Sequence, residues 1–511
     1  MSAVKDFYPL SPLQEGMLFH SMMDTSSGVY VKQATYVLRG ELNIPALERA
    51  WQDAVDRFAI LRTFFVWEDL KKPVQVVQSD VKVTLHVEDW SNLPEAEAEQ
   101  RLAEYGEADR VRAFDISQPP LMRMALITLG KDNHRLVWTW HHILFDGWSE
   151  GLLDRALFEL YSAHCTGRKP QLARTRPFRD YIRWLQQQEL PKAEAFWRRT
   201  LQGFTRPSML ARSLSVEEQA QPARYEKKRV LVSEETTTAL NAFTRAHHLT
   251  LNTLLQGAWS LILSKYCGQL DVVFGSVVSG RPADLEGVQN MIGLLANTLP
   301  VRVRIAPDQT LLSWLNDVQM QQVESRQYEY SPLQQIQKWS DVPRGMPLFE
   351  SLLSFDMSQL DTSDSSTPTQ EKENIKIGVS SSFIQISNPL SVLINTGRQL
   401  FIGISYDPRM FADEMVDQLL ADYNRLLENF VAHPERSLSS FLAQIGPDRA
   451  ETDELTELVE RSNLTRNQFM IWLGQKLNGD VPLYNIPMII KFSGHVEPDH
   501  IRNAWRTLIN S

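Results

Sequence analysis

Residues 141–149 read HHILFDGWS, and this stretch decides the fold of the 511-residue chain. A strand-like run, RLVWTW over 135–140, precedes it, and apolar residues at helical spacing follow it from Leu152 onward. The local order is therefore strand, two histidines, turn, aspartate, helix. Successive side chains of a strand point to opposite faces, so His141 and His142 cannot both line one cavity if the strand continues through them. We expect one imidazole to face a site while the other packs or anchors.

The residue types in this stretch suit proton transfer. A histidine of ordinary pKa, about 6.5, leaves a neutral base that can accept a proton from an amine or a hydroxyl. Asp146 could orient that imidazole or hold the loop, and Gly147 permits a tight backbone. Ser149 could cap the helix that follows.

Metal binding and covalent catalysis are both disfavoured by the sequence. Adjacent strand histidines diverge, and neither Cys165 nor Cys267 lies at zinc-ligand spacing from a partner. Neither cysteine has the setting of an activated nucleophile, and no activated serine is apparent, so a covalent acyl-enzyme is not expected. We expect no metal site.

Composition places the chain among globular intracellular proteins. Apolar residues make up 43% and charged residues 22%, and 511 residues exceed the size at which one core keeps growing, so two or more lobes are expected. The formal charge of −10 argues against a nucleic-acid binder, which needs a basic footprint. No run is long and apolar enough for a membrane helix, and the first residues lack the layout of a signal peptide. We expect a cytoplasmic protein without membrane or nucleic-acid partners.

Further motifs occur in order along the chain. The pattern His-His-x-x-x-Asp-Gly is complete, and the accompanying stretches are YPLSPLQEGM over 8–17, LRTFF over 61–65, DVVFG over 271–275, SGRP over 279–282, IGLLANTLPVR over 292–302, YSPL over 330–333 and NPL over 388–390. Over about residues 5–445 this series resembles the condensation domains of nonribosomal peptide synthetases. Two departures are Arg57-Phe58, where the family commonly has His after the arginine, and Asp356-Met357-Ser358, where it has an aromatic-proline pair.

The resemblance implies an α/β fold of two chloramphenicol-acetyltransferase-like lobes in a V arrangement, with an active-site tunnel between them. We expect residues 1–175 to form the N-terminal lobe, which carries the histidine motif, and residues 176–450 to form connecting helices and the C-terminal lobe. Within them the pattern predicts a helix over 45–58, a helix over 251–266 and a strand over 271–276. One active site is expected, because the His-His-x-x-x-Asp-Gly pattern occurs once.

The resemblance also assigns roles to single residues. It makes His142 the catalytic or substrate-positioning histidine and gives Asp146 a structural role, paired with Arg62. Such a buried pair is physically sensible, since removal of one partner would strand a charge at a cost of about 3 to 5 kcal/mol. The remaining expected roles are support of the site by His141 and Gly147, and contact with the substrate tunnel by Trp148, Ser149, Ser279 and Asn297.

The activity that the resemblance implies is amide-bond formation between a carrier-bound acyl or peptidyl thioester donor and the amine of a carrier-bound aminoacyl acceptor. The chain would bind no cofactor itself, since both substrates would be held on the 4′-phosphopantetheine of donor and acceptor peptidyl carrier domains. Neighbouring adenylation and condensation-type domains of a synthetase are further expected partners. Three alternatives stay open: an epimerisation domain of the same fold, a free-standing acyltransferase acting on coenzyme A thioesters, and a non-catalytic carrier-recruiting platform. Heterocyclisation is disfavoured, because the domains that perform it replace the two histidines with aspartates.

The last segment, residues 451–511, contains a weak internal repeat. The stretches LTRNQFMIW over 464–472 and PLYNIP over 482–487 look like the opening of another condensation-type domain, and residues 493–505 parallel residues 39–51 in spacing. We expect this segment to be the truncated start of a second such domain, unable to build a second site.

Overall fold

The computed structural model describes residues 4–23, 29–210, 225–356, 370–372, 375–384 and 388–446. The chain divides into two compact units, Met1–Gly446 and Pro447–Ser511. The second unit lies outside the described residues, and the expectation of a second domain start over 451–511 falls there, so it stays a prediction.

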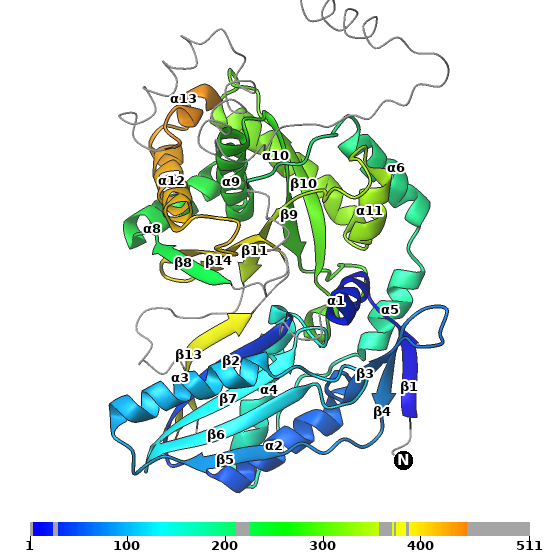
Figure 1. Cartoon of the computed structure of the whole chain (residues 1–511), viewed down its shortest axis with the longest axis vertical. Coiled ribbons are helices and arrows are strands. Elements are labelled where there is room, and N and C mark those ends of the chain that lie inside the picture. Colours follow the sequence, from blue (N-terminus) through cyan, green and yellow to red (C-terminus); the bar gives the residue numbers. More distant parts are fainter. Residues whose placement is uncertain are drawn as a thin grey trace, which may run out of the picture. The chain divides into compact units, whose positions relative to one another are not determined.

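The first lobe is built on a six-stranded sheet in the order β12-β13-β2-β7-β6-β5 (Figure 1). All neighbours in it are antiparallel except β5 and β6. Its strands are β2 (Val31–Gly40), β5 (Leu85–Asp89), β6 (Met122–Gly130), β7 (Asn133–His141), β12 (Gln370–Lys372) and β13 (Ile375–Ile384). A smaller sheet, β1-β4-β3, adds β1 (Val4–Pro9), β3 (Thr63–Val66) and β4 (Val74–Gln78).

Helices cover both faces of the first sheet. They are α1 (Pro12–Met23), α2 (Ile44–Arg57), the short η1 (Ala59–Arg62), α3 (Glu95–Val111) and α4 (Gly147–Thr166). The side chains of β7 alternate between two apolar clusters: Trp138 and Trp140 pack in the core with α2 and α4, whereas Val137 packs on the α3 side. Because both faces are buried, the histidine strand is held rigidly from two sides.

The second lobe has its own six-stranded sheet, in the order β10-β9-β11-β14-β15-β8. Its strands are β8 (Glu226–Leu231), β9 (Asp271–Val278), β10 (Asn297–Arg304), β11 (Ser351–Asp356), β14 (Leu390–Thr396) and β15 (Leu400–Tyr406). Its helices are α8 (Glu234–Ala246), α9 (Leu251–Cys267), η2 (Val288–Asn290), α10 (Leu311–Ser325), η3 (Arg326–Tyr328), α11 (Leu333–Trp339), α12 (Asp413–Ala432) and α13 (Leu438–Leu442). Two further helices, α5 (Phe178–Gln186) and α6 (Leu190–Leu201), lead from the first sheet to the second.

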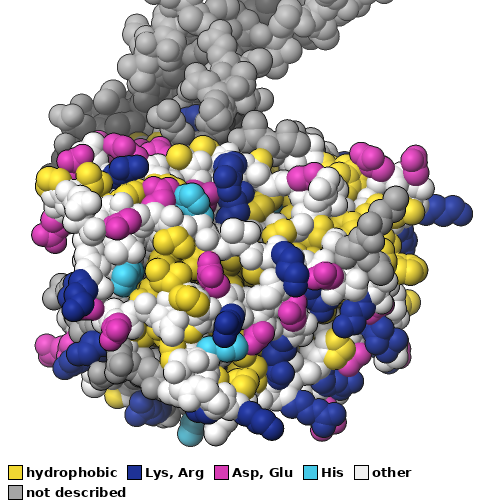
Figure 2. Space-filling view, turned by 90° about the horizontal axis from the view of Figure 1, so that it is seen from below, with side chains coloured by type: hydrophobic (Ala, Val, Ile, Leu, Met, Phe, Trp, Pro, Cys, Tyr) yellow, Lys and Arg dark blue, Asp and Glu magenta, His cyan; other side chains and the backbone are white. Residues whose placement is uncertain are grey.

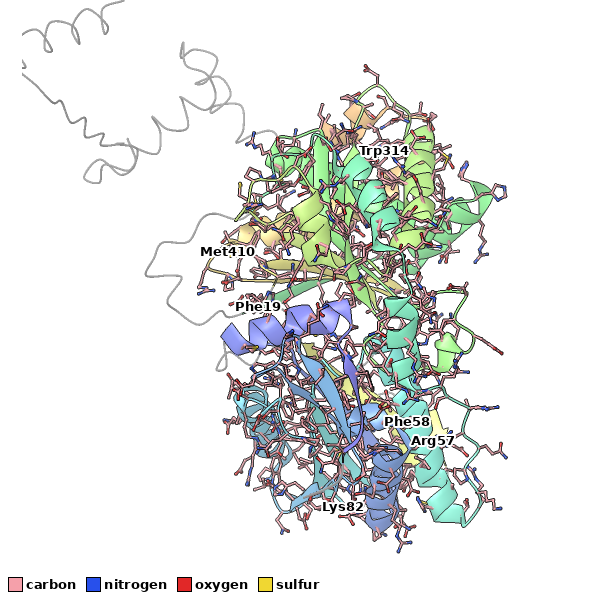
Figure 3. The ribbon with its side chains drawn as sticks, turned by 90° about the vertical axis from the view of Figure 1, so that its right-hand side faces the viewer. Phe19, Arg57, Phe58, Lys82, Trp314 and Met410 are labelled. Carbon is pink, nitrogen blue, oxygen red and sulfur yellow. The ribbon has the colours of Figure 1, made fainter. Side chains whose placement is uncertain are left out.

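The expected α/β class with two lobes is confirmed, and so are the expected elements. The helix predicted over 45–58 is α2, which begins at Ile44 because the side chain of Asn43 accepts a hydrogen bond from the Ala46 amide at 3.0 Å. The helix predicted over 251–266 is α9, and the strand predicted over 271–276 is β9. Arg57 and Phe58, one of the two departures from the family pattern, lie at the C-terminal end of α2 (Figure 3).

One segment corrects the expected division at residue 175. The strand β13 pairs antiparallel with β2 over nearly its whole length, from Ile375 opposite Gly40 to Ile384 opposite Lys32. The first sheet is therefore completed by residues from the range assigned to the second lobe. Among the described residues, no helix is long and apolar enough to cross a bilayer.

Candidate functional site

The end of β7 is fixed by backbone hydrogen bonds on both sides. The His141 amide donates to the Leu121 carbonyl at 3.0 Å, and the His142 amide donates to the Tyr30 carbonyl at 2.7 Å. Tyr30 has a φ of 64°, a left-handed conformation that a bulky residue rarely adopts. The hydrogen bonding between β7 and the segment before β2 thus continues one residue past the strand. Because neighbouring side chains on an extended chain point to opposite faces, the two imidazoles diverge.

His141 is the buried member of the pair, with 3% of its surface exposed. Its Nδ1 accepts a hydrogen bond from the Ile143 amide at 3.2 Å, and its Nε2 lies 3.4 Å from the Ser21 hydroxyl. Burial, with the neighbouring His142, lowers the pKa of His141 to about 3. Because Nδ1 accepts, the neutral ring carries its proton on Nε2 and serves as an anchor. Its ring also forms part of the wall of a cavity of about 240 Å³, together with Val31 and Phe114.

His142 is partly exposed, which distinguishes it from its neighbour. Burial of the ring lowers the pKa of His142 to about 3, and the positive charge of Lys32 adds to this, while the Phe145 backbone acts in the opposite direction. Its Nδ1 is buried and has no hydrogen-bond partner among the described residues. The imidazole is therefore neutral at physiological pH, and a neutral imidazole can accept a proton.

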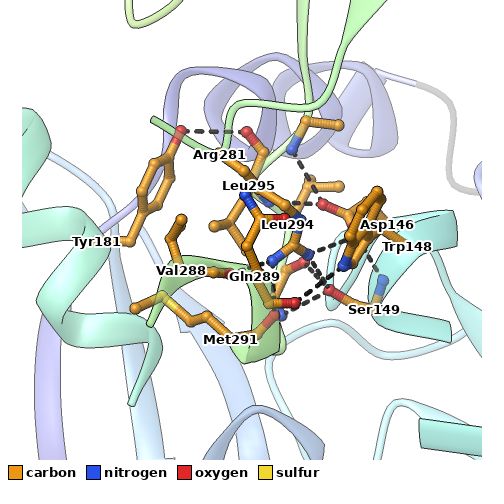
Figure 4. A network of polar contacts seen from close by, with 12 residues as sticks. Asp146, Trp148, Ser149, Tyr181, Arg281, Val288, Gln289, Met291, Leu294 and Leu295 are labelled. Atoms are coloured by element: carbon orange, nitrogen blue, oxygen red, sulfur yellow. Dashed lines mark hydrogen bonds and ion pairs between the residues drawn. The ribbon is translucent and has the colours of Figure 1, made fainter. Parts of the chain in front are cut away.

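Asp146 organises the turn that follows the histidines. It is the N-cap of α4, and its Oδ1 accepts a hydrogen bond from the Ser149 amide at 2.8 Å. Its Oδ2 accepts from the amides of Leu295 and Ala296, at 3.0 and 3.1 Å (Figure 4). A carboxylate that accepts several such hydrogen bonds is held firmly in one place.

The positive partner of Asp146 is Arg281, which lies on the loop after β9. Its Nη2 atom is 3.3 Å from Asp146 Oδ1 and 3.0 Å from the Ser149 hydroxyl, and its Nη1 atom donates to the carbonyls of Val288 and Met291 (Figure 4). The side chains of Arg281 and Asp146 are 1% and 6% exposed. This ion pair joins the histidine loop to the second lobe.

The remaining motifs meet at the same place. The Ser149 hydroxyl donates to the Gly293 carbonyl and accepts from the Gly293 amide. The Ser11 hydroxyl donates to the Leu294 carbonyl, and the Gln14 amide group donates to the Ile143 carbonyl within the histidine motif. Residues from the stretches 8–17, 141–149, 279–282 and 292–302 thus form one hydrogen-bonded network, called the motif junction below.

The expected pairing of Asp146 with Arg62 is wrong. Arg62 is 2% exposed, and its guanidinium donates to the backbone carbonyls of Val55, Asp56, Gln78 and Ser79. It therefore fixes the end of α2 against β4. Sequence reasoning missed Arg281, although this arginine belongs to the motif stretch 279–282, because nothing local tells which arginine a distant aspartate will meet.

Three of the four residues expected at the tunnel have partners within the protein. Trp148 donates from its indole to the Gln289 carbonyl, Ser149 belongs to the motif junction, and the Asn297 side-chain amide donates to the carbonyls of Glu329 and Ser331. Ser279 is exposed beside β9, and its contact with substrate stays a prediction.

Two further details of the loop differ from or extend the expectations. The cap of α4 is Asp146 rather than Ser149, and Gly147 is the first residue of the helix. Tyr181, which the sequence did not point to as a site residue, donates from its hydroxyl to the Leu295 carbonyl at 3.1 Å. Burial and the charge of Asp146 raise the pKa of Tyr181 above its ordinary value, so it remains a donor.

Two further features of the described residues are the placement of metal-binding side chains and the distribution of charge on one face. Within the described residues, no group of three or more histidine, cysteine, aspartate or glutamate side chains is placed to hold a metal ion. On the face shown in Figure 2, acidic and basic side chains are interspersed rather than segregated.

Comparison with known proteins places this geometry in a family. Residues 4–451 match the family model described as Condensation domain. The chain is 43% identical over 441 residues to a linear gramicidin synthase of Brevibacillus parabrevis, covering 85% of this chain and 9% of that protein. It is 32% identical over 442 residues to surfactin synthase subunit 3 of Bacillus subtilis (strain 168), covering 86% of this chain and 34% of that one. The chain spans less than a tenth of the length of the gramicidin synthase polypeptides that it matches.

Solved structures share the fold. The starter condensation domain of rhizomide synthetase superposes with a TM-score of 0.71 at 19% identity, over 85% of this chain and 97% of that one. The X-domain from teicoplanin biosynthesis gives a TM-score of 0.71 at 24% identity, over 84% and 96% of the two chains. At these sequence identities the structural similarity shows only that the fold is shared.

Proposed function

The chain belongs to the condensation-domain family of nonribosomal peptide synthetases, and from this premise we propose that it forms an amide bond between a thioester donor and an aminoacyl acceptor. The observation that carries the proposal is His142. It is the partly exposed one of the two motif histidines, and its low pKa keeps the ring neutral. A neutral imidazole is the form that can take a proton from an amine.

The proposed step is a direct transfer. The acceptor nitrogen attacks the thioester carbonyl of the donor, the C–N bond forms, and the C–S bond breaks as the donor thiol leaves. His142 accepts the proton that the nitrogen loses and returns it to the departing sulfur, so the enzyme ends unchanged. Alignment of two tethered substrates can itself supply about 7 to 11 kcal/mol through effective molarity, so His142 can act as a base or as a hydrogen-bond partner that orients the amine.

The other motif residues act by holding this geometry. Asp146 and Arg281 fix the histidine loop to the second lobe, and His141 anchors the strand end. We assign these residues to support rather than to chemistry, because the Asp146 carboxylate, the two terminal nitrogens of Arg281 and the His141 Nδ1 bond to protein partners. This assignment is consistent with the support role expected for His141 and Asp146 from the sequence.

Carrier domains are the proposed partners. The curated relatives are synthetase polypeptides much longer than this chain, which supports a setting among carrier and adenylation domains. Both substrates would arrive on the 4′-phosphopantetheine of donor and acceptor carriers, and no resident cofactor is needed for the transfer.

The test is intact-mass analysis of donor-loaded and acceptor-loaded carrier proteins incubated with the chain. Several aminoacyl pairs are sampled with wild type, His142→Ala and the control Gly16→Ala, whose added methyl group meets no atom within 4 Å. We expect condensed product on the acceptor carrier with wild type and the control, and its loss with His142→Ala.

Other outcomes point to the alternatives. Deuterium exchange at an α-carbon without condensed product indicates epimerisation. Product from coenzyme A thioesters without any carrier indicates a free-standing acyltransferase. Carrier binding without any reaction across the sampled pairs indicates a non-catalytic platform.

A further inference from the structure

Positively charged side chains from the two lobes contact one aromatic ring. The guanidinium carbon of Arg110, in the last turn of α3, lies 4.6 Å from the centre of the Phe383 ring on β13. The Nζ atom of Lys227, on β8 of the second lobe, lies 4.5 Å from the same ring centre. A single small anion beside this ring is therefore within reach of both positive groups. Arg110 and Lys227 are called the cation pair below.

The cation pair lies between the lobes. The strand β8 is at the edge of the second sheet, and it faces the part of the first lobe where β13 and α3 lie (Figure 1). Phe383 pairs with Gln33 on β2, and the Gln33 side-chain oxygen accepts a hydrogen bond from Arg110 at 2.9 Å. The Gln33 side-chain amide donates to the Thr139 hydroxyl on β7 at 3.0 Å. The pair is thus joined to the histidine strand, while Lys227 is exposed to solvent.

Within the described residues, no carboxylate forms an ion pair with either member of the cation pair. Their side-chain contacts there are the hydrogen bond and the two ring contacts given above. Two acids of α3 act on Arg110 by their charge: Glu107 is exposed, and Asp109 forms an ion pair with Arg123 at 2.9 Å. The positive charge at this place is therefore only partly compensated.

The ammonium of Lys227 responds to this charge. Its partial loss of hydration between the lobes, together with the charges of Arg110 and Lys32, lowers the pKa of Lys227 to about 8. Lys32 is itself paired with Glu150. Lys227 remains mostly charged at neutral pH, and a bound anion would relieve its repulsion from Arg110. Charge complementarity thus favours an anionic ligand at the cation pair.

The proposed substrates carry such an anion. Each is held on a 4′-phosphopantetheine arm, whose phosphodiester is the fixed negative charge between the carrier and the thioester. A guanidinium and an ammonium bind phosphate oxygens through charge-assisted hydrogen bonds, the guanidinium as a planar fork and the ammonium as a compact charge. The cation pair offers one group of each kind.

The arm is long enough to join the cation pair to His142. Phe383, Gln33 and Thr139 lie side by side on three neighbouring strands, which places Phe383 about 10 Å from the histidine strand. His142 is three residues, or about 10 Å, farther along that strand, so the direct separation is about 14 Å. Between phosphorus and sulfur the arm has about as many bonds as four residues of extended backbone, which span about 15 Å. His142 lies past the last residue of β7, so an arm that rounds the end of the sheet reaches its ring.

We propose that Arg110 and Lys227 bind the phosphodiester of the 4′-phosphopantetheine arm, one cation from each lobe, and anchor the arm while its thioester lies at His142. The inference rests on the proposed function for the identity of the ligand. Binding of the arm can nevertheless be measured without turnover, so the two proposals are tested separately.

The test is a calorimetric titration of the full chain with 4′-phosphopantetheine, with pantetheine, which lacks the phosphate, and with inorganic phosphate. Lys227→Met removes the charge, Lys227→Arg keeps it, and Lys228→Met is the matched control, because the neighbouring Lys228 is already paired with Asp417 on α12. We expect wild type to bind 4′-phosphopantetheine about 10-fold or more tightly than pantetheine. This preference should be lost in Lys227→Met and kept in Lys227→Arg and Lys228→Met.

Three results would overturn the proposal. They are equal affinities of wild type for 4′-phosphopantetheine and pantetheine, an undiminished preference in Lys227→Met, and binding of inorganic phosphate as tight as that of 4′-phosphopantetheine. Arg110→Met is the second variant, and the same loss of preference is expected. Amide formation in a chain whose binding ignores Lys227 contradicts this inference alone, whereas binding that depends on Lys227 without amide formation contradicts the proposed reaction alone.

Discussion

The Asp146 carboxylate accepts hydrogen bonds from α4 and from the loop between β9 and β10, and it forms an ion pair with Arg281 in that loop. These contacts determine how the histidine loop is held. The donors are the amides of Ser149, Leu295 and Ala296 and the guanidinium of Arg281. The structural role of Asp146 was expected from the family resemblance, although the sequence predicted the helix cap at Ser149 and not at Asp146. Its partner was not, since Arg281 is 135 residues away and the choice between Arg281 and Arg62 depends on the packing of two lobes.

A double-mutant cycle distinguishes the two arginines. Asp146→Asn and Arg281→Met remove the two ends of one buried pair, so we expect a coupling free energy above about 1 kcal/mol in urea unfolding. Asp146→Asn and Arg62→Met touch separate networks, and their effects should add within about 0.5 kcal/mol. Strong coupling in the second cycle and none in the first would restore the pairing with Arg62.

His142 should make stability depend on pH. Burial lowers the pKa of His142 to about 3 from an ordinary 6.5, so between these values the unfolded chain binds a proton that the folded chain does not. Stability is therefore lost as the pH falls through this window. We expect His142→Gln to reduce the loss of unfolding free energy between pH 7.5 and pH 5.5 by about 1 kcal/mol. The control is His86→Gln, an exposed histidine, and an equal pH dependence in both variants would show that His142 is not held neutral.

At the scale of elements, the loop from β9 to β10 is packed too closely for a side chain at Gly280 or Gly293. A methyl group at Gly293 would lie 2.2 Å from the ring of Phe178 on α5, and that ring is itself buried. We expect Gly293→Ala to lower the unfolding free energy by about 1 to 3 kcal/mol, measured by thermal and urea unfolding. Gly16→Ala in α1 should instead be neutral or stabilising, because its methyl group meets nothing and alanine favours a helix. A neutral Gly293→Ala would mean that the loop is loosely packed.

Asp154, where α4 contacts the first sheet, should make stability depend on pH in the opposite direction to His142. Asp154 has a pKa of about 7 in the folded chain against an ordinary 3.8, so the folded chain holds the extra proton and loses stability as the pH rises between these values. Asp154→Asn keeps an acceptor for the Tyr36 hydroxyl without the charge. We expect the variant to gain stability over wild type at pH 8 relative to pH 4, by on the order of 1–3 kcal/mol in urea unfolding. A gain in unfolding free energy that is the same at both pH values would contradict the raised pKa of Asp154 in the folded chain.

Elements defined by local pattern were predictable, and those defined by distant pairing were not. The helix α2 follows from Asn43, which caps it, and from apolar residues at helical spacing. The strand β13 was missed, because its partner β2 lies more than 300 residues earlier and no local signal says which sheet it joins. The same reason accounts for the missed contact of Arg281 with the histidine loop.

At the scale of the whole molecule, two lobes are joined where the sequence motifs meet. The order of the motifs along the chain indicated the family by resemblance, and the resemblance implied the two-lobed α/β class. In the structure these residues, although far apart in sequence, are close in space. In the motif junction, residues of the separate stretches hydrogen-bond to one another. What sequence alone left open was the path of the chain between the lobes.

The measurement that tests the role of His142 most directly is the single-turnover rate of amide formation between loaded carriers, followed by intact mass for wild type, His142→Gln and His86→Gln. We expect condensed product with wild type and His86→Gln, and a rate at least about 100-fold lower with His142→Gln in protein that is equally folded. Equal rates for His142→Gln and wild type would contradict the proposed mechanism, because the neutral imidazole at the end of β7 would then have no part in the transfer.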